Sequence, residues 1–245
     1  MKIILTEKNF AELDAFDRTR RLIGEENFLK LQSSTVAIFG IGGVGSFTAE
    51  ALARSGIGNL ILIDKDNVDV TNINRQIHAL HSTIGESKVK IMRRRILDIN
   101  PNAKVDTVQK FYLPNDDAEN FFLRPYDYVV DAIDTITAKI NLVVECRRRK
   151  IPLISSMGAG NKFDPTRFKV ADLFKTSVDP VAKIMRKKLK ELGIKNLKVV
   201  YSDEIPRAVD TENLTGKIIG SLSFVSSVAG LIIAAEVVKD LINEK

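Results

Sequence analysis

The chain has 245 residues, of which 44% are hydrophobic and 28% are charged. This composition supplies one sizeable buried core and excludes a largely disordered protein. Lys and Arg exceed Asp and Glu by 37 − 31 = 6, a charge that is compatible with a nucleotide or RNA partner. The single cysteine, Cys146, excludes an internal disulfide and a cysteine-based zinc site, and it predicts a cytoplasmic protein.

The first 160 residues alternate between apolar runs and helical patterns. Short helices are expected within 7–32, and further helices end near 54, 100 and 149. Strands are predicted at 35–39, 59–63, 105–108, 126–133 and 151–154, most of them from apolar runs. Repeated alternation of this kind predicts an α/β, Rossmann-like fold, in which helices cover both faces of a mostly parallel sheet.

The remaining residues predict a C-terminal strand and helix extension. Asp179 and Pro180 are suited to the N-cap and first position of a basic helix. A strand at 197–201 and a loop at 203–217 follow, and serines within the apolar run 218–238 favour a packed final helix over a membrane span. We expect one domain over 1–245.

Within that domain, the predicted nucleotide-binding core covers 7–160. The crossover loop, the basic helix and the closing helix are expected within 161–245. The helix before residue 100 is predicted to begin with Ser87 as its cap, and Pro101 follows its end.

The turn after the first strand has the glycine spacing of a dinucleotide-binding loop: Gly40, Gly42, Gly43 and Gly45. Glycines let the backbone approach a phosphate, and the following helix presents its amino end to the anion. Asp64 ends the second strand, where a carboxylate binds a ribose hydroxyl, and Asp66 can share that role. The alternative for Asp64 is a cap at the end of a strand.

Two cations distinguish this pattern from that of a dehydrogenase. Arg75 lies in a polar block with Asn72 and Gln76, and Lys88 begins the next helix. Arginine binds phosphate oxygens with two parallel hydrogen bonds, and lysine adds a point charge. Such a pair is expected where negative charge develops on a departing pyrophosphate.

Asp134 follows a predicted central strand, at the same sheet edge as the glycine turn. A carboxylate there can hold Mg²⁺ against the phosphates. Asp131 precedes the last apolar residues of that strand and is expected to point into the structure. The histidines, His78 and His81, are expected to have structural roles.

Together these motifs resemble the ubiquitin-activating-like (ThiF/MoeB/HesA) superfamily of adenylating enzymes, over about residues 10–160. The resemblance implies a set of ATP and Mg²⁺ residues: Asp64, Asn72, Arg75, Lys88 and Asp134. It also implies a homodimer in which Arg21 reaches the ATP of the neighbouring copy. Some relatives bind a monovalent cation, Na⁺ or K⁺, near the nucleotide loop.

Segments 155–166 and 172–180 resemble the tRNA threonylcarbamoyladenosine dehydratases more narrowly. This resemblance implies a ligase-type, AMP-forming reaction on the threonylcarbamoyl group at adenosine 37 of tRNA. Its carboxylate would be adenylated, its own carbamoyl group would close a ring, and water would be lost. The basic stretches at 93–95, 147–150 and 186–198 suit an RNA backbone or a solvated surface.

The alternative function is adenylation of the C-terminus of a small ubiquitin-like sulfur-carrier protein, with a sulfur-transfer protein as partner. Segment 156–220 contains no cysteine that could relay the substrate, and Cys146 is expected to be buried and inert. Two other classes are a nicotinamide-dependent reductase and a non-catalytic nucleotide sensor. Arg75 and Lys88 argue against the reductase.

Overall fold

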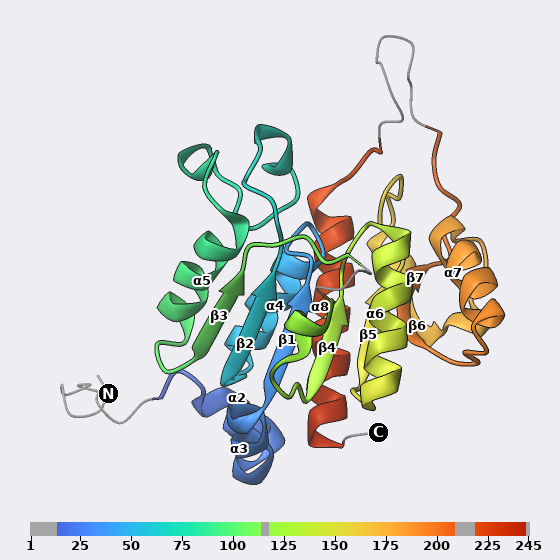
Figure 1. The fold of residues 1–245 in the computed structure, drawn as a ribbon. Coiled ribbons are helices and arrows are strands. Elements are labelled where there is room, and N and C mark those ends of the chain that lie inside the picture. Colours follow the sequence, from blue (N-terminus) through green and yellow to red (C-terminus); the bar gives the residue numbers. More distant parts are fainter. Residues whose placement is uncertain (1–13, 114–117, 209–218, 244–245) are drawn as a thin grey trace, which may run out of the picture.

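The computed structural model describes residues 14–113, 118–208 and 219–243, and these residues contain a seven-stranded sheet (Figure 1). The strands lie in the order β3-β2-β1-β4-β5-β7-β6. The strands are β1 (Thr35–Phe39), β2 (Asn59–Ile63), β3 (Lys104–Val108), β4 (Tyr128–Asp131), β5 (Leu153–Ser156), β6 (Phe168–Asp172) and β7 (Lys198–Ser202). β6 runs antiparallel to β7, whereas the other strand pairs are parallel.

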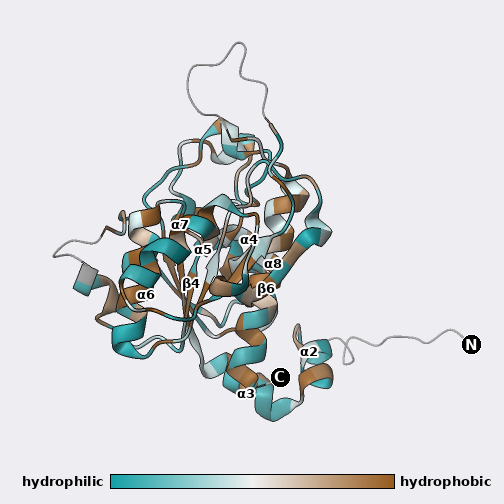
Figure 2. Cartoon of the chain, turned by 90° about the vertical axis from the view of Figure 1, so that its right-hand side faces the viewer, coloured by the Kyte–Doolittle hydropathy of each residue, from teal (hydrophilic) through white to brown (hydrophobic). Residues whose placement is uncertain are grey.

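Helices cover both faces of this sheet, as the sequence predicted (Figure 2). The longer helices are α2 (Asp17–Ile23), α3 (Glu25–Ser33), α4 (Gly45–Arg54), α5 (Lys88–Ile99), α6 (Ile136–Arg149), α7 (Pro180–Glu191) and α8 (Ser223–Ile242). The short 3₁₀ helices are η1 (Val70–Asn72), η2 (His81–Thr83), η3 (Ala118–Phe122), η4 (Pro165–Arg167) and η5 (Leu173–Lys175). The first face packs against α4, α5 and α8, and the second against α6 and α7.

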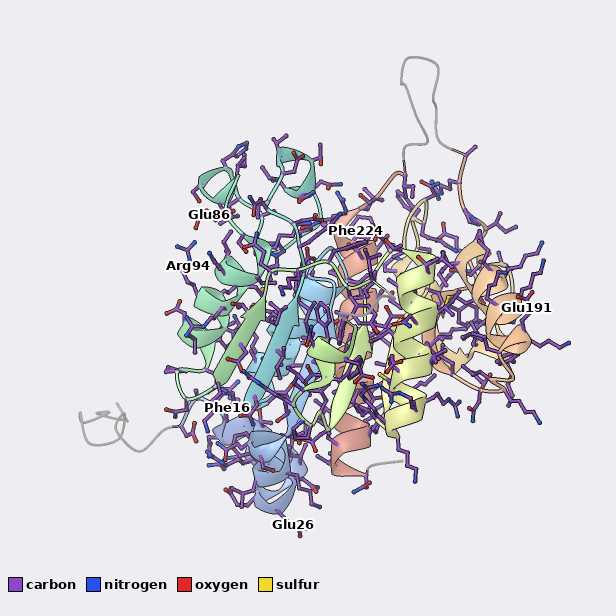
Figure 3. The ribbon with its side chains drawn as sticks, in the orientation of Figure 1. Phe16, Glu26, Glu86, Arg94, Glu191 and Phe224 are labelled. Carbon is purple, nitrogen blue, oxygen red and sulfur yellow. The ribbon has the colours of Figure 1, made fainter. Side chains whose placement is uncertain are left out.

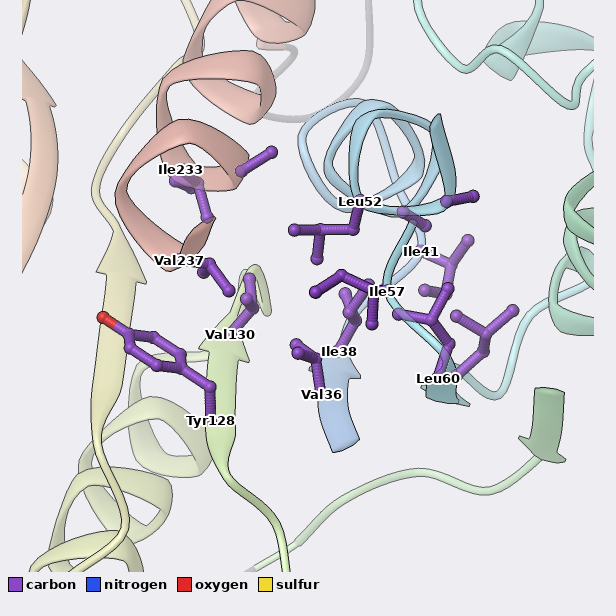
Figure 4. Packing of buried hydrophobic residues seen from close by; sticks show 14 of the residues in the cluster. Val36, Ile38, Ile41, Leu52, Ile57, Leu60, Tyr128, Val130, Ile233 and Val237 are labelled. Atoms are coloured by element: carbon purple, nitrogen blue, oxygen red, sulfur yellow. The ribbon is translucent and has the colours of Figure 1, made fainter. Parts of the chain in front are cut away.

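The larger core lies between the central strands and the helices of the first face (Figure 4). Its strands are buried on both sides, which is why they read as continuous apolar runs. The buried residues labelled in the close-up come from the strands, from the helices and from the turns between them: Val36, Ile38, Ile41, Leu52, Ile57, Leu60, Tyr128, Val130, Ile233 and Val237. The Tyr128 hydroxyl donates to Asp240 Oδ2 at 2.6 Å and thereby ties β4 to α8.

Several predicted boundaries were wrong. The strand predicted at 126–133 is shorter, because after Asp131 the Ile133 backbone is bonded by side chains rather than by a neighbouring strand. The strand predicted at 151–154 lies two residues later. β6 was not predicted. Ser87 occupies the N-cap position of α5, but its side chain makes no capping hydrogen bond.

The predicted loop at 203–217 lies largely outside the described residues, which resume at residue 219. Among the described helices, including α8, none is both long enough and apolar enough to cross a bilayer.

Candidate active site

A cavity of about 650 Å³ opens at the carboxyl ends of the central strands. It lies where the chain leaves β1 for β2 on one side and later returns to β4 on the other, which is the usual ligand position in such sheets. Ten of the predicted residues line it: Gly40, Gly42, Gly43, Asp64, Asp66, Asn72, Arg75, Gln76, Lys88 and Asp134. Gly45 and Arg21 are not in its wall.

The glycine turn is too crowded for side chains at two positions. Gly40 has a φ of +90°, and a Cβ there would lie 2.5 Å from the Ala132 carbonyl oxygen. A Cβ at Gly45 would lie 1.8 Å from the Gly40 oxygen. Gly45 therefore acts through the backbone, by letting α4 begin directly against the turn. Side chains provide no cap for α4 in the described structure, and Gly42, Gly43 and Val44, which precede its first residue, line the cavity. The amino end of α4 therefore lies at the cavity, where a helix N-terminus favours an anion.

Asp64 connects the end of β2 to the glycine turn. Its Oδ2 accepts from the Ile41 N–H at 2.6 Å, and its Oδ1 accepts from the Asp66 N–H at 2.8 Å. This arrangement includes the strand-end capping that the sequence left open as an alternative. The carboxylate also lines the cavity, so the ribose role remains a prediction.

The two predicted cations reach the cavity from different elements. Lys88 is the first residue of α5, is only 6% exposed, and pairs with Asp66 at 3.2 Å. The Arg75 Nη1 donates to the Thr71 oxygen at 2.8 Å and to Asn74 Oδ1 at 2.9 Å. These bonds fix the guanidinium, while the Cγ of Arg75 lies beside the glycine turn, 3.4 Å from the position that a Cβ at Gly43 would take.

Asn72 and Gln76 shape the wall next to Arg75. Asn72 Oδ1 accepts from the Asp69 N–H at 3.2 Å, which fixes the turn at η1. Gln76 is buried, and its Oε1 has no hydrogen-bond partner among the described residues. Gln76 lines the cavity, and this acceptor is buried within the protein next to that wall.

Asp134 is exposed on the opposite wall, where its Oδ1 accepts from the Thr135 hydroxyl at 3.2 Å. Behind it, Asp131 points into the structure as predicted and is 0% exposed. Asp131 pairs with Lys139, itself 1% exposed, at 3.0 Å, and accepts from the Ser155 hydroxyl at 2.5 Å.

This buried pair also holds the residue that precedes Asp134. The Ile133 N–H donates to Asp131 Oδ1 at 3.2 Å, and Lys139 Nζ donates to the Ile133 oxygen at 3.1 Å. Both backbone polar groups of Ile133 are therefore bound by the pair, which positions the Asp134 carboxylate.

The site at Asp134 suits a divalent cation that takes most of its coordinating oxygens from a bound phosphate compound and from water. Within the described residues, no three His, Cys, Asp or Glu side chains gather as a metal site. Mg²⁺ commonly takes one or two protein carboxylates, with phosphate oxygens and water completing its octahedron. A single exposed carboxylate in the wall of a cavity of this size fits that pattern.

Arg21 lies far from the cavity within one chain. It belongs to α2, at the end of the sheet opposite the strand carboxyl ends (Figure 1). Its side chain is 77% exposed and pairs only with Asp17, at 2.8 Å, among the described residues. The neighbouring Leu22 is 86% exposed. A role at the nucleotide therefore requires a second copy and remains a prediction.

The histidines and the cysteine lie outside the cavity wall. His78 is 2% exposed, and burial, together with the charges of Lys88 and Arg95, lowers its pKa to about 4. Burial raises the pKa of the Cys146 thiol to about 12, so the thiol is protonated at neutral pH. His81 is exposed on η2.

Several wall residues were not predicted: Lys65, Lys110, Phe111, Tyr112, Lys139, Ser156 to Gly160, Val181, Ile219 and Ser221. Segments 110–112 and 156–160 follow β3 and β5, so the rule that ligands bind at strand carboxyl ends could have located them. Lys139 carried no such signal, because it lies within a helix and reaches back toward the sheet.

Comparison with known proteins places this geometry in context. A model of the ThiF family matches residues 16–245. The tRNA threonylcarbamoyladenosine dehydratase of Bacillus subtilis is 51% identical over 245 residues, which cover 95% of this chain and 96% of that protein. The Escherichia coli protein of the same name is 47% identical over 175 residues, covering 71% of this chain and 65% of that protein.

Solved structures give the same result for the fold. The crystal structure of the Escherichia coli tRNA N6-threonylcarbamoyladenosine dehydratase in complex with ATP matches with a TM-score of 0.87 at 38% identity, covering 99% of this chain and 98% of that chain. The complex of that protein with AMP has the same TM-score at 37% identity. The resemblance inferred from the sequence motifs is therefore confirmed.

Proposed function

The chain belongs to the ThiF family, and we propose that it catalyses the ATP-dependent dehydration of N6-threonylcarbamoyladenosine at position 37 of tRNA. One observation supports this most directly. The nucleotide cavity, with its glycine turn and two cations, is continuous with Ser156 to Gly160, within the segment that resembles the dehydratases. The residues expected to bind ATP and those of the dehydratase-like segment therefore line the same cavity.

The reaction has two steps. A carboxylate oxygen of the threonylcarbamoyl group attacks the α-phosphorus of ATP, and the bond to the β-phosphate oxygen breaks, so that pyrophosphate leaves. The carbamoyl group of the same side chain then attacks the acyl carbon and loses a proton, while AMP departs with the original carboxylate oxygen. The nucleotide product is one water lighter. Because the nucleophile is already tethered, proximity replaces a covalent thiol relay.

We assign the phosphates to the amino end of α4, with Arg75 and Lys88 next to the departing pyrophosphate. Both cations are held before any ligand binds, Arg75 by Thr71 and Asn74, and Lys88 by Asp66. Charge groups that are already in place stabilise developing negative charge without reorganisation. Asp64 would then hold the ribose.

Mg²⁺ would be held by Asp134 together with phosphate oxygens, and when bound it neutralises charge on the triphosphate. The contribution of this chain is to aim the Asp134 carboxylate, through the Ile133 backbone that Asp131 and Lys139 bind. Gln76 offers an additional acceptor at the wall, close to the place where a monovalent cation was anticipated.

The proposed enzyme is a homodimer in the cytoplasm. Exposed Leu22 beside Arg21 supports an interface at α2, through which Arg21 reaches the nucleotide of a second copy. The proposed single domain is supported by the sheet, since β7, β6 and α8 of segment 161–245 pack against elements of segment 7–160.

The decisive experiment is nucleoside mass spectrometry of tRNA that carries threonylcarbamoyladenosine, after incubation with enzyme, ATP and Mg²⁺. A loss of about 18 Da at the modified adenosine, the mass of water, is the expected result. Asp134→Ala and Lys88→Ala should each abolish AMP formation. Asp98→Ala changes an exposed carboxylate of α5 outside the cavity wall and should leave turnover intact.

An unchanged nucleoside mass with the wild-type chain would contradict the proposal. Pyrophosphate exchange that required a protein ending in Gly-Gly would instead support the alternative of sulfur-carrier adenylation. Wild-type turnover by Asp134→Ala or Lys88→Ala would be compatible with the proposed reaction but would contradict the roles assigned to these residues.

A further inference from the structure

The sequence contains three basic clusters: 93–95 on α5, 147–150 at the end of α6, and a third on α7. They differ in what their charged side chains already bind within the chain. The α5 cluster is engaged within the chain at every arginine. Arg93 donates to the Val105 oxygen, Arg94 pairs with Glu86, and Arg95 forms two bonds with Glu50. Each arginine of this cluster therefore contributes to the packing of α5.

The α6 cluster is engaged in the same way. Arg147 donates to Asn196, and both Arg148 and Arg149 pair with Glu119 and Glu145. Arg149 also lies over the Phe122 ring at 4.4 Å. Two carboxylates thus balance two of the three arginines, whereas Arg147 binds only the neutral Asn196, and the exposed Lys150 has no side-chain partner among the described residues.

The α7 cluster differs. Lys183, Lys187 and Lys190 are exposed, and none has a side-chain hydrogen bond or ion pair with another described residue. Their spacings of four and three residues place them on one helix face, over about 10 Å of helix. Other cations of the helix are used internally: Arg186 donates to Thr176, and Lys188 pairs with Glu191.

The fold does not require this lysine face. The opposite side of α7 is anchored by Ala182, Met185 and Leu189, all of which are 0% exposed. Like charges at helical spacings repel one another, so the three lysines oppose helix stability in the isolated chain. An external polyanion would reverse that unfavourable interaction.

The helix that carries the lysine face begins next to the cavity. Asp179, the N-cap of α7, accepts from the Gly158 N–H at 3.1 Å, and Val181 lines the cavity wall. Lys183 follows Val181 by two residues, about 200° further around the helix, so the lysine face lies on the outer side of α7 and an RNA bound along it would reach the cavity past the amino end of the helix. Figure 3 shows Glu191 of α7 and Arg94 of α5 on opposite sides of the molecule.

We propose that Lys183, Lys187 and Lys190 bind the sugar–phosphate backbone of tRNA and guide the modified adenosine into the cavity. The proposal rests on the proposed function, since it takes tRNA as the polyanion. It assigns the main RNA contact to α7, because the lysines along one face of α7 have no side-chain partner among the described residues, whereas Arg93 to Arg95 of α5 and Arg148 and Arg149 of α6 are already bound within the chain. Contacts of this kind position RNA without reading its sequence.

The test compares two triple variants with equal charge. Lys183→Gln/Lys187→Gln/Lys190→Gln removes the free cations, and Lys30→Gln/Arg94→Gln/Arg148→Gln removes exposed cations that are already paired. Each changes the net charge from +6 to 6 − 3 = +3. The affinity for tRNA is measured by fluorescence anisotropy at several salt concentrations.

The α7 variant should bind tRNA at least about tenfold more weakly at low salt, and its log–log salt slope should be shallower by about 2, since each lysine–phosphate contact contributes about 0.7 to 0.9. The control variant should keep the wild-type slope. In turnover assays the α7 variant should raise KM for modified tRNA while kcat and the affinity for ATP stay close to wild type.

Equal losses in both variants would overturn the assignment, because a general charge effect would then explain them. Unchanged tRNA affinity in the α7 variant would also overturn it and would leave an acidic protein as the partner for this face. Failure of the proposed function is seen separately, as wild-type enzyme that leaves the mass of the modified nucleoside unchanged.

Discussion

Lys139→Met should destabilise the protein in a strongly pH-dependent way. The substitution keeps the length of the side chain but leaves Asp131, which is 0% exposed, without its cation. At a separation of 3.0 Å, two unit charges attract by about 5 to 6 kcal/mol for an effective dielectric constant of about 20. Removal of one partner from a buried pair typically costs about 3 to 5 kcal/mol.

The second limit on the cost comes from protonation. A carboxyl group deprived of its cation can stay in the core by taking up a proton. For an ordinary aspartate, with a pKa of about 3.9, that costs about 4 kcal/mol at pH 7 and about 1.4 kcal/mol less for each pH unit below it. Both limits therefore place the loss in unfolding free energy near 4 kcal/mol at pH 7, falling to about 1.5 kcal/mol near pH 5.

Urea denaturation of wild type and variant from pH 5 to 8, followed by circular dichroism, measures this difference. In the double variant Asp131→Asn/Lys139→Met both charges are absent, and it should recover most of the loss. Lys188→Met removes a cation from an exposed pair with Glu191 and should cost less than about 0.5 kcal/mol. A loss that does not change between pH 5 and 8, or a double variant as unstable as Lys139→Met, would refute the argument.

Three further predictions test other parts of the structure. Mixing Arg21→Ala with Asp134→Ala subunits should restore about a quarter of wild-type activity, because half of the dimers are mixed and each has one complete site; no recovery would rule out action across the interface. His78 takes up a proton near pH 6.5 when unfolded but only near pH 4 when folded, so unfolding free energy should fall by about 3 kcal/mol as pH drops through that window, and His78→Gln should remove this part of the slope. Gly45→Ala should lower the free energy of unfolding by at least about 3 kcal/mol and abolish ATP binding. Gly42→Ala introduces a Cβ that meets only ordinary contacts, so it should change the free energy of unfolding by less than about 1 kcal/mol in thermal unfolding.

The parallel strands could be predicted because burial on both faces leaves a continuous apolar run. β1 and β2 coincide with the predicted strands at 35–39 and 59–63. β6 was missed because its residues do not form an apolar run: Phe168 is buried, while Lys169 and Val170 are exposed. A strand with one neighbour and one wet face has no such run.

The cavity could be predicted as far as strand ends determine it. Gly40, Asp64 and Asp134 each follow a strand, and parallel strands bring those ends together. Lys139 could not be located in that way, but the sequence contained another indication of its role. An aspartate predicted to point inward requires a cation, and Lys139 lies in the helix that follows Asp131.

The basic clusters show a different limit of sequence reasoning. Clusters 93–95 and 147–150 look as cationic as the lysines of α7. Glu145, three or four residues before Arg148 and Arg149, is a partner that helical spacing reveals, but Glu50 and Glu119 lie 45 and 29 residues from the arginines that they bind. Helical spacing reveals pairs three or four residues apart, whereas these partners become visible only when the elements pack.

The strand order accounts for why these separate segments meet at all. β1 has β2 on one side and β4 on the other, and the chain turns toward β2 first. The connections that follow β1 and β4 therefore diverge and leave a crevice, with the glycine turn on one wall and Asp134 on the other. β5 lies beyond β4, and its carboxyl end continues into Ser156 to Gly160. A triphosphate bound at α4 then has its α-phosphorus between these walls, so we expect the carboxylate to approach from the β5 side, where α7 also begins.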